Sequence, residues 1–208
     1  MKLSRFFFWT PPGFEAWRRQ SRMGDPLYET KRLSWSWPPR GARIYTRALR
    51  AIYAGAPTRA ARLYRLHLLW RPGDLDLRCA YGEYLLWVAR DRERAIALAD
   101  SVMAQGKSYQ HAWDMALYVK TVGLLDLRRY PEALEGFEQT RCTGYVFALI
   151  QRLLPLGIGL DRCRERLLSD LARWGEISDP RVVDLGPEIA EAESLLARLE
   201  HARRPRLA

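Results

Sequence analysis

From residue 42 to residue 203, apolar residues recur three and four positions apart, which is the spacing of one face of an α-helix. The first two stripes lie at residues 44–52 and 60–68, and Thr58 is the expected N-cap of the second helix. Breaks at glycine, proline or charged turns separate the later stripes, which predict helices over residues 75–88, 94–104, 110–125, 131–139, 145–154, 160–174 and 187–203. No segment alternates with period two, so the pattern predicts an all-α protein.

Residues 1–41 follow a different pattern. Several prolines disfavour helix at the residue before each of them, so we expect a mostly extended N-terminal arm, in which only residues 13–22 suit a short helix. Half of the eight tryptophans of the chain lie in this arm, at Trp9, Trp17, Trp35 and Trp37. Each tryptophan buries on the order of 200 Å² when it packs, so these side chains are expected to contact either the chain's own helices or a partner.

Three alanines mark the second helix of successive predicted pairs. Ala60, Ala95 and Ala133 are 35 and 38 residues apart. Small side chains at such positions allow two helices to approach closely, and a helix pair that recurs near this period is typical of a helical repeat array. The chain is therefore expected to contain three stacked pairs of antiparallel helices over residues 42–145.

These pairs resemble the tetratricopeptide repeat (TPR) family, whose unit is 34 residues long. The first unit matches the spacings of the family at Ile44, Ala48, Ala51, Ala60, Tyr64 and Pro72. The second unit matches at Tyr81, Gly82, Leu85, Ala95 and Ala99, and its two alanines come one residue later than the spacing of the family. The third matches at Leu117, Thr121, Leu124, Ala133 and Phe137. The resemblance implies a right-handed α-solenoid, after which residues 146–204 form a capping helix pair and a terminal helix and residues 205–208 a tail.

The resemblance also implies a concave face that binds a peptide or protein segment through first-helix residues. In the first unit the concave positions of the family are apolar and fall on Tyr45, Leu49 and Ile52. One flank of the same helix is cationic, because four- and three-residue spacings place on it Arg43, Arg47 and Arg50. A groove with an apolar floor and a cationic edge suits a partner with an acidic or amphipathic segment.

The formal net charge is +10, from 34 basic and 24 acidic residues, and it is unevenly spread. Residues 30–73 hold ten basic residues and no acidic residue. The like charges of these basic side chains repel one another unless an anionic surface lies nearby. This favours docking to an acidic protein, an anionic membrane or a nucleic acid. A coding bias is the other explanation of the arginine content, because only four of the 34 basic residues are lysine.

Motifs that would carry catalysis or hold a cofactor are weak. Residues 101–108 end like a phosphate-binding loop but follow a helix and lack its first glycine, so Gly106 is interpreted as a helix C-cap. Residues 157–162 are interpreted as a turn between helices. The three cysteines and three histidines are too dispersed for a disulfide framework or a metal site, which favours a reducing compartment. We therefore expect no enzyme activity, no metal and no cofactor.

The remaining apolar residues are assigned to the core. His67 is expected to pack within the first repeat, and helical spacing places between the helices Trp70, Tyr81, Tyr84, Trp87, Tyr109, Trp113, Tyr118 and Phe137. The alternative for some of these rings is a place on the concave face of the array. The most apolar stretch, residues 144–160, contains a glutamine, an arginine and a proline, which argues against a membrane span. The N-terminus shows no secretory signal, so a cytoplasmic location is expected.

Together these observations predict a non-catalytic scaffold or adaptor for protein–protein interaction. Its size and repeat count also resemble those of bacterial secretion-system chaperones, so a chaperone-like component of a larger, bacterial assembly is included in the prediction. The alternative is a nucleic-acid or anionic-surface binding protein that uses the arginine-rich residues 31–71. The identity of the partner and the oligomeric state stay open.

Overall fold

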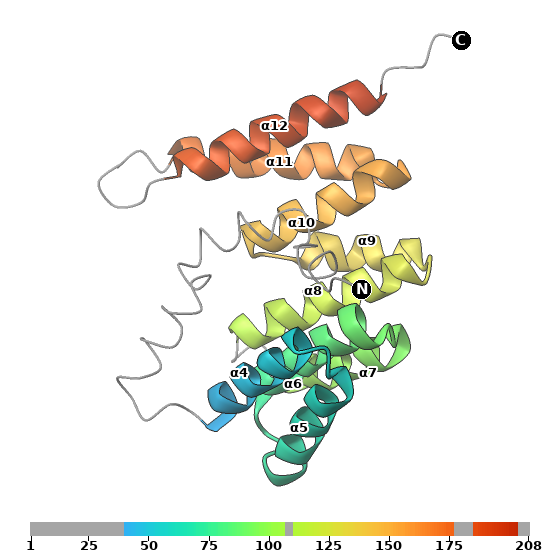
Figure 1. The fold of residues 1–208 in the computed structure, drawn as a ribbon. Coiled ribbons are helices and arrows are strands. Elements are labelled where there is room, and N and C mark those ends of the chain that lie inside the picture. Colours follow the sequence, from blue (N-terminus) through green and yellow to red (C-terminus); the bar gives the residue numbers. More distant parts are fainter. Residues whose placement is uncertain (1–39, 107–109, 177–184, 204–208) are drawn as a thin grey trace. The chain divides into compact units, whose positions relative to one another are not determined.

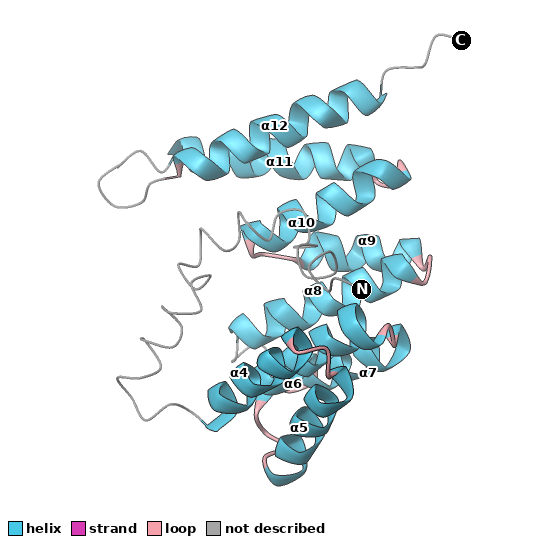
Figure 2. Cartoon of the chain, in the orientation of Figure 1, coloured by secondary structure: helices cyan, strands magenta, loops and turns pink. Residues whose placement is uncertain are grey.

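The computed structural model describes residues 40–106, 110–176 and 185–203, and every regular element in these ranges is a helix (Figure 1). No strand occurs in them (Figure 2), so the predicted all-α class is confirmed for the described part of the chain. The predicted N-terminal arm, with its short helix, lies outside the described residues. The described residues belong to two compact units, residues 40–142 and residues 143–203.

The first unit is built from helical hairpins. Its helices are α4 (Arg40–Tyr53), α5 (Pro57–Trp70), α6 (Leu75–Tyr84), α7 (Arg92–Met103), α8 (Gln110–Asp126) and α9 (Tyr130–Gln139), and the π-helical turn η1 (Leu85–Ala89) extends α6. They pair in chain order, α4 with α5, α6 with α7 and α8 with α9. Successive hairpins also pack together, because α6 contacts α4 and α5, and α8 contacts α6 and α7.

The turn inside each of these hairpins uses the same backbone conformation. One residue with positive φ follows the first helix of each pair, at Gly55 (φ 73°), Arg90 (φ 61°) and Arg128 (φ 61°). The next backbone N–H bonds back into the helix, as the N–H of Ala56 does to the carbonyl of Ala51 at 2.8 Å. The last carbonyls of the helix are thus satisfied while the chain reverses within a few residues.

A buried alanine stands five residues after each of these turns. The exposed fractions are 0, 0 and 1% at Ala60, Ala95 and Ala133. Four residues further along the same helices, the side chains are again buried, at Tyr64, Ala99 and Phe137. The predicted small positions therefore lie in the interface where the second helix of each hairpin faces its neighbours.

Among the described glycines, Gly136 of α9 has the least room for a side chain. A Cβ atom added at Gly136 of α9 would overlap the hydroxyl of Thr121 on α8. Thr121 is itself 1% exposed, and its Oγ1 donates a hydrogen bond to the Leu117 carbonyl at 2.8 Å. Glycine is favoured at this point because a side chain would have to displace Thr121 from its place between the two helices.

The second hairpin contains one more residue than its neighbours between its two small positions. Ala48 and Ala60 of the first hairpin are twelve residues apart, whereas Gly82 and Ala95 of the second are thirteen apart. The π-helical turn η1 lies between Gly82 and Ala95, and such a turn accommodates a residue inserted into an α-helix. This inserted residue explains why Ala95 comes one position later in the sequence than the repeat spacing predicts.

Aromatic rings fill the space between the first and second hairpins. Tyr64 of α5 lies against Tyr81 and Tyr84 of α6, with ring centroids 5.4 and 5.8 Å away. The Tyr84 hydroxyl donates a hydrogen bond to the carbonyl of Pro57, 2.9 Å away, at the start of α5. Burial raises the pKa of Tyr64, which keeps its hydroxyl protonated inside this cluster.

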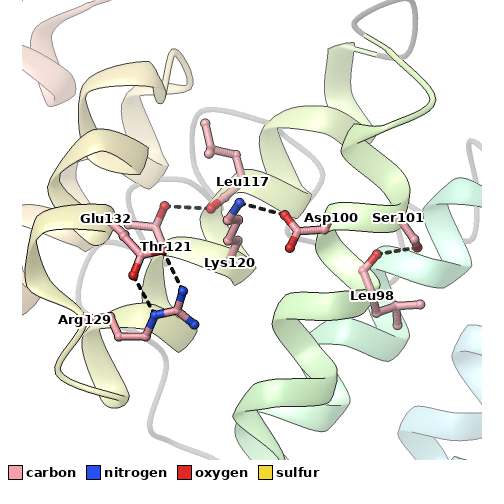
Figure 3. A network of polar contacts seen from close by, with 8 residues as sticks. All are labelled: Leu98, Asp100, Ser101, Leu117, Lys120, Thr121, Arg129 and Glu132. Carbon is pink, nitrogen blue, oxygen red and sulfur yellow. Dashed lines mark hydrogen bonds and ion pairs between the residues drawn. The ribbon is translucent and has the colours of Figure 1, made fainter.

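Exposed ion pairs lie between the second and third hairpins and within the third (Figure 3). Lys120 of α8 reaches Asp100 of α7 with a nitrogen–oxygen distance of 2.7 Å. The Arg129 guanidinium donates two hydrogen bonds, of 2.7 and 2.6 Å, to the carboxylate of Glu132 at the start of α9. Such exposed pairs contribute about 0–1 kcal/mol each, but they neutralise much of the charge on this surface.

The second unit contains α10 (Thr143–Leu153), the 3-10 turn η3 (Leu154–Leu156), α11 (Leu160–Glu176) and α12 (Gly186–Arg203). Phe147 of α10 meets Trp174 of α11 edge to face, with ring centroids 6.2 Å apart. Gln151 of α10 donates a hydrogen bond to Glu191 of α12 at 2.8 Å. None of the described helices is long and apolar enough to cross a membrane, including the apolar α10.

Two expectations about helix ends differ from the structure. Thr58 was expected to cap α5, and this is wrong, because the N-cap is Ala56 and Pro57 already lies in the first turn. Proline has the φ of a helix built in and lacks the N–H that a cap would satisfy, so the helix begins earlier. Gly106 was expected to be the C-cap of α7, but the helix ends at Met103 with Ala104 as its C-cap; Gly106 lies in the turn that follows, with φ 85° and its N–H bonded to the Met103 carbonyl at 3.0 Å.

Gly136→Ala is expected to lower the free energy of unfolding by about 1–3 kcal/mol, because the new methyl group pushes Thr121 away from α9. The better helix propensity of alanine offsets up to about 1 kcal/mol of this loss. Gly175→Ala is the matched control, since a Cβ there meets no atom within 4 Å, and it should not destabilise the protein. Urea unfolding followed by circular dichroism measures both, and equal stability of Gly136→Ala and the wild type would contradict the close approach.

Two buried thiols are expected to make the protein less stable at alkaline pH. Burial raises the pKa of Cys79 in α6 and of Cys163 in α11 from 9 to about 12. A group whose pKa is higher in the folded state stabilises the fold below its unfolded pKa, and this contribution disappears as pH rises toward the folded pKa. The free energy of unfolding should therefore fall above pH 9, by up to about 1.4 kcal/mol per pH unit for each thiol.

The variant with Cys79→Ala and Cys163→Ala should show a shallower decline over the same pH range. Urea unfolding at a series of pH values provides the comparison. A wild-type stability that stays level above pH 9, or an equal decline in the variant, would show that the thiols do not have raised pKa values.

Candidate interaction surface of the first hairpin

The first hairpin is the strongly basic part of the described chain. Neither α4 nor α5 contains an acidic residue, so the acid-free run found in the sequence covers both helices and the turn between them. Exposed arginines project from the two helices and from the residue after α5, at Arg47, Arg50, Arg59, Arg62, Arg65 and Arg71. Within the described residues none of the six forms an ion pair, and Arg65 only contacts the Ala61 carbonyl, at 3.4 Å.

Some arginines of the other two hairpins form ion pairs. Arg92 of α7 pairs with Asp126 of α8 at 3.2 Å, and Arg129 pairs with Glu132. Unpaired cations that are close in space raise the positive potential of the surface they share, and this potential attracts anionic groups. The positive surface of the described array is therefore concentrated on α4 and α5.

The predicted partner-binding residues of α4 lie at different depths. Tyr45 and Leu49 are half-buried, whereas Ile52 is only 7% exposed and belongs to the core. Arg47 and Arg50 are exposed on the same helix. The side chain of Arg43 and the four tryptophans Trp9, Trp17, Trp35 and Trp37 lie outside the described residues.

The equivalent first-helix positions of the second and third hairpins are mostly closed. Counting along the helix from the small positions Gly82 and Thr121 gives six side chains, of which Glu83, the counterpart of Leu49, is half-buried and charged. The other five are buried: Cys79, Leu86, Tyr118, Val122 and Leu125. Of these equivalent positions, the accessible apolar ones in the described residues are Tyr45 and Leu49 of α4, and the same helix also carries the half-buried Ile44 and Tyr53, which is 61% exposed.

Three large apolar side chains are exposed at the end of α5. Leu66, Leu69 and Trp70, which we call the α5 tip, have exposed fractions of 50, 77 and 85%. The expectation that Trp70 packs in the core is wrong. The inner face of α5 already carries Ala60, Tyr64 and His67, and helical geometry turns residues 66, 69 and 70 toward the opposite side.

The other aromatic residues show why that expectation failed only at Trp70. Tyr81, Tyr84, Trp113, Tyr118 and Phe137 are buried as predicted, and Trp87 is half-buried. Tyr109 lies outside the described residues. All the buried rings lie on faces that meet a neighbouring helix, whereas Trp70 stands in the last turn of α5 on its outer face. Burial of a side chain of this size is worth about 2–3 kcal/mol, so its exposure needs an explanation.

The backbone behind the α5 tip is held in place. The ring of His67, which is half-buried as expected for a residue packed in the repeat, lies 3.0 Å from the Asp74 carboxylate. The other oxygen of Asp74 accepts the Leu77 N–H at 3.0 Å and caps α6. The N–H of Arg71 bonds to the His67 carbonyl at 2.8 Å. The α5 tip is therefore presented by a hydrogen-bonded turn with a defined shape.

Reactive side chains are not gathered at this surface. Cys79 and Cys163 are buried, and their raised pKa values keep both thiols protonated at neutral pH, so neither has the thiolate that a nucleophile needs. Among the described residues, no group of three or more histidine, cysteine, aspartate or glutamate side chains lies close enough to hold a metal ion.

Comparisons with protein-family models, with curated proteins and with solved structures each find no match for this chain. The function has to be inferred from the repeated hairpins and from the two surfaces of the first hairpin. Sequence reasoning had singled out α4 and the arginines but had missed the α5 tip. The available signal was the presence on α5 of apolar residues outside the stripe formed by residues 60, 64 and 67.

Proposed function

We propose that the chain is a non-catalytic scaffold or adaptor built on a TPR-like α-solenoid, and that it binds a segment of a partner protein. The observation that carries this proposal is the recurrence of one hairpin design. Three successive hairpins have a left-handed residue after the first helix and a buried alanine five residues later. Arrays of this kind function through their surfaces, which extend from repeat to repeat.

The packing order of the helices supports the same proposal. α4 packs against α6 and α6 against α8, so the first helices of consecutive hairpins are in contact, and each second helix also touches the next first helix. In a helical repeat protein, a continuous row of first helices is the side on which peptide segments bind. We infer that the partner approaches this row at α4, where its apolar edge is still accessible.

The proposed contact has an apolar and a cationic part. Tyr45 and Leu49 supply half-buried apolar surface, while Arg47 and Arg50 stand exposed beside them. Ile52 supports this edge from the core. An acidic or amphipathic segment would pair its carboxylates with the arginines and bury its apolar side against Tyr45 and Leu49, which gives both steering and affinity. The same adaptor role includes a chaperone-like component of a larger assembly in the cytoplasm.

Reversing the charge of α4 is expected to abolish partner capture. With the full chain as bait in its native cells, the variant with Arg47→Glu and Arg50→Glu should recover a specific partner at least about tenfold less efficiently. The variant with Tyr45→Ala and Leu49→Ala should do the same. The variant with Arg141→Glu and Arg198→Glu changes the net charge equally on exposed positions elsewhere, so it should capture as the wild type does. Full capture by either α4 variant would contradict the assignment of the site.

A second candidate function, binding to a nucleic acid or another anionic surface, is favoured by one observation: the arginines of α4 and α5 form no ion pair with another described residue. Phosphate contacts release counterions, so affinity for an oligonucleotide should fall steeply with salt if this candidate is right. Fluorescence anisotropy with single- and double-stranded oligonucleotides measures this dependence. Negligible binding at low salt would remove the nucleic-acid form of the candidate.

A further inference from the structure

We propose that the α5 tip and the arginines next to it dock the protein onto an anionic phospholipid membrane surface. The docking surface consists of Leu66, Leu69 and Trp70 together with Arg62 and Arg65. It is separate from the apolar edge of α4 to which the proposed function assigns the partner protein. The inference does not depend on whether that partner site exists, but it rests on the second candidate function, because it names a phospholipid membrane as the anionic surface that the arginines of α5 bind.

The residues of this docking surface share the outward face of α5. Arg62, Leu66 and Leu69 follow one another at four- and three-residue steps, and Arg65 precedes Leu69 by four. The two arginines come first along the helix, and the three apolar side chains follow toward its C-terminal end. All five side chains are exposed, while Ala60 and Tyr64 on the opposite face are buried.

The shape of the surface favours a bilayer over a protein partner. Trp70 and Leu69 project into solvent with exposed fractions of 85 and 77%, so they form a protrusion and not a pocket. A protein partner would need a matching cavity, whereas the boundary between lipid headgroups and acyl chains accepts protruding apolar side chains of any shape. Tryptophan is enriched at this boundary, where its ring has an apolar body and a polar N–H.

The two leucines argue against a nucleic acid as the main ligand of the α5 tip. A tryptophan can stack on a base, and arginines can bind phosphates, but exposed Leu66 and Leu69 have no favourable contact on a charged backbone. An anionic membrane offers a favourable contact to both the apolar side chains and the arginines of the docking surface. The leucines and Trp70 enter the acyl boundary, and Arg62 and Arg65 remain at the level of the phosphates.

The hydrogen-bonded turn behind the α5 tip makes this insertion feasible without unfolding. The His67–Asp74 contact of 3.0 Å and the cap that Asp74 provides for α6 fix the last turn of α5. The apolar side chains are already outside the core, so docking does not remove any of them from the packing of the array. A single short apolar patch holds a protein only weakly on a membrane, and stable binding requires the added attraction of basic residues.

Vesicle sedimentation tests the proposal directly with the full chain. The probes are vesicles of phosphatidylcholine alone and vesicles that also contain phosphatidylserine. The wild type should sediment with the anionic vesicles, and high salt should weaken this binding. Binding to phosphatidylcholine alone should be at least about tenfold weaker, because each arginine near an anionic surface contributes a several-fold gain.

Two variants separate the parts of the docking surface. The variant with Leu69→Ser and Trp70→Ser, and the variant with Arg62→Glu and Arg65→Glu, should each lower the partition coefficient at least about tenfold. These side chains are exposed, so both variants should keep the thermal stability and circular dichroism of the wild type.

Matched controls make the same kinds of substitution, leucine to serine and arginine to glutamate, at exposed positions outside the first hairpin. The control variant with Leu156→Ser and Leu168→Ser removes two other exposed leucines. The control variant with Arg141→Glu and Arg198→Glu gives the same change in net charge. Both should bind anionic vesicles within about threefold of the wild type.

Several results would overturn the proposal. These are no binding to anionic vesicles, equal binding to both lipid compositions, or unchanged binding of either α5 variant. Oligonucleotide binding that depends on Arg62 and Arg65 but not on Leu69 and Trp70, in the absence of vesicle binding, would assign the surface to a nucleic acid. Binding of a designed acidic amphipathic peptide that both α5 variants abolish, again without vesicle binding, would assign it to a protein.

Discussion

The close approach of paired helices at alanine and glycine positions is the constraint on which the first unit depends. Ala60, Ala95 and Ala133 are almost completely buried, and at Gly136 the helices leave no room for even one methyl group beside Thr121. A larger side chain at any of these positions would separate the two helices of a hairpin. Because α6 packs on α4 and α8 packs on α6, the displacement would pass to the neighbouring hairpin as well.

This constraint also explains how the surface of the first hairpin can be used for binding. The inner face of α5 is complete with small and aromatic residues, so its outer face is not needed for packing. That outer face carries the α5 tip and arginines that form no ion pair with any other part of the chain that the structure describes, whereas Lys120 and Arg129 of the third hairpin do form ion pairs. A partner segment at α4 and a membrane at α5 would together make the protein an adaptor that recruits its partner to an anionic membrane.

The helices and their small positions could be predicted because a three- and four-residue period is set by helix geometry. The exposure of Trp70 could not be predicted from the sequence, because α5 carries apolar residues on two faces. The period of the pattern does not say which of these faces meets α4 and α6. The late Ala95 did signal an inserted residue, but only the backbone showed that η1 absorbs it. The depth of Ile52 depends on the packing of neighbouring helices, so the sequence showed an apolar helix face without showing which part stays accessible.

A double-mutant cycle at the contact between α8 and α9 tests the central claim most directly. Thr121→Ala removes the hydroxyl that a Cβ at Gly136 would overlap. If α8 and α9 lie so close that a Cβ at Gly136 overlaps the Thr121 side chain, Gly136→Ala should destabilise the Thr121→Ala protein by at least about 1 kcal/mol less than it destabilises the wild type. Additive effects of the two substitutions, within about 0.5 kcal/mol, would contradict the account.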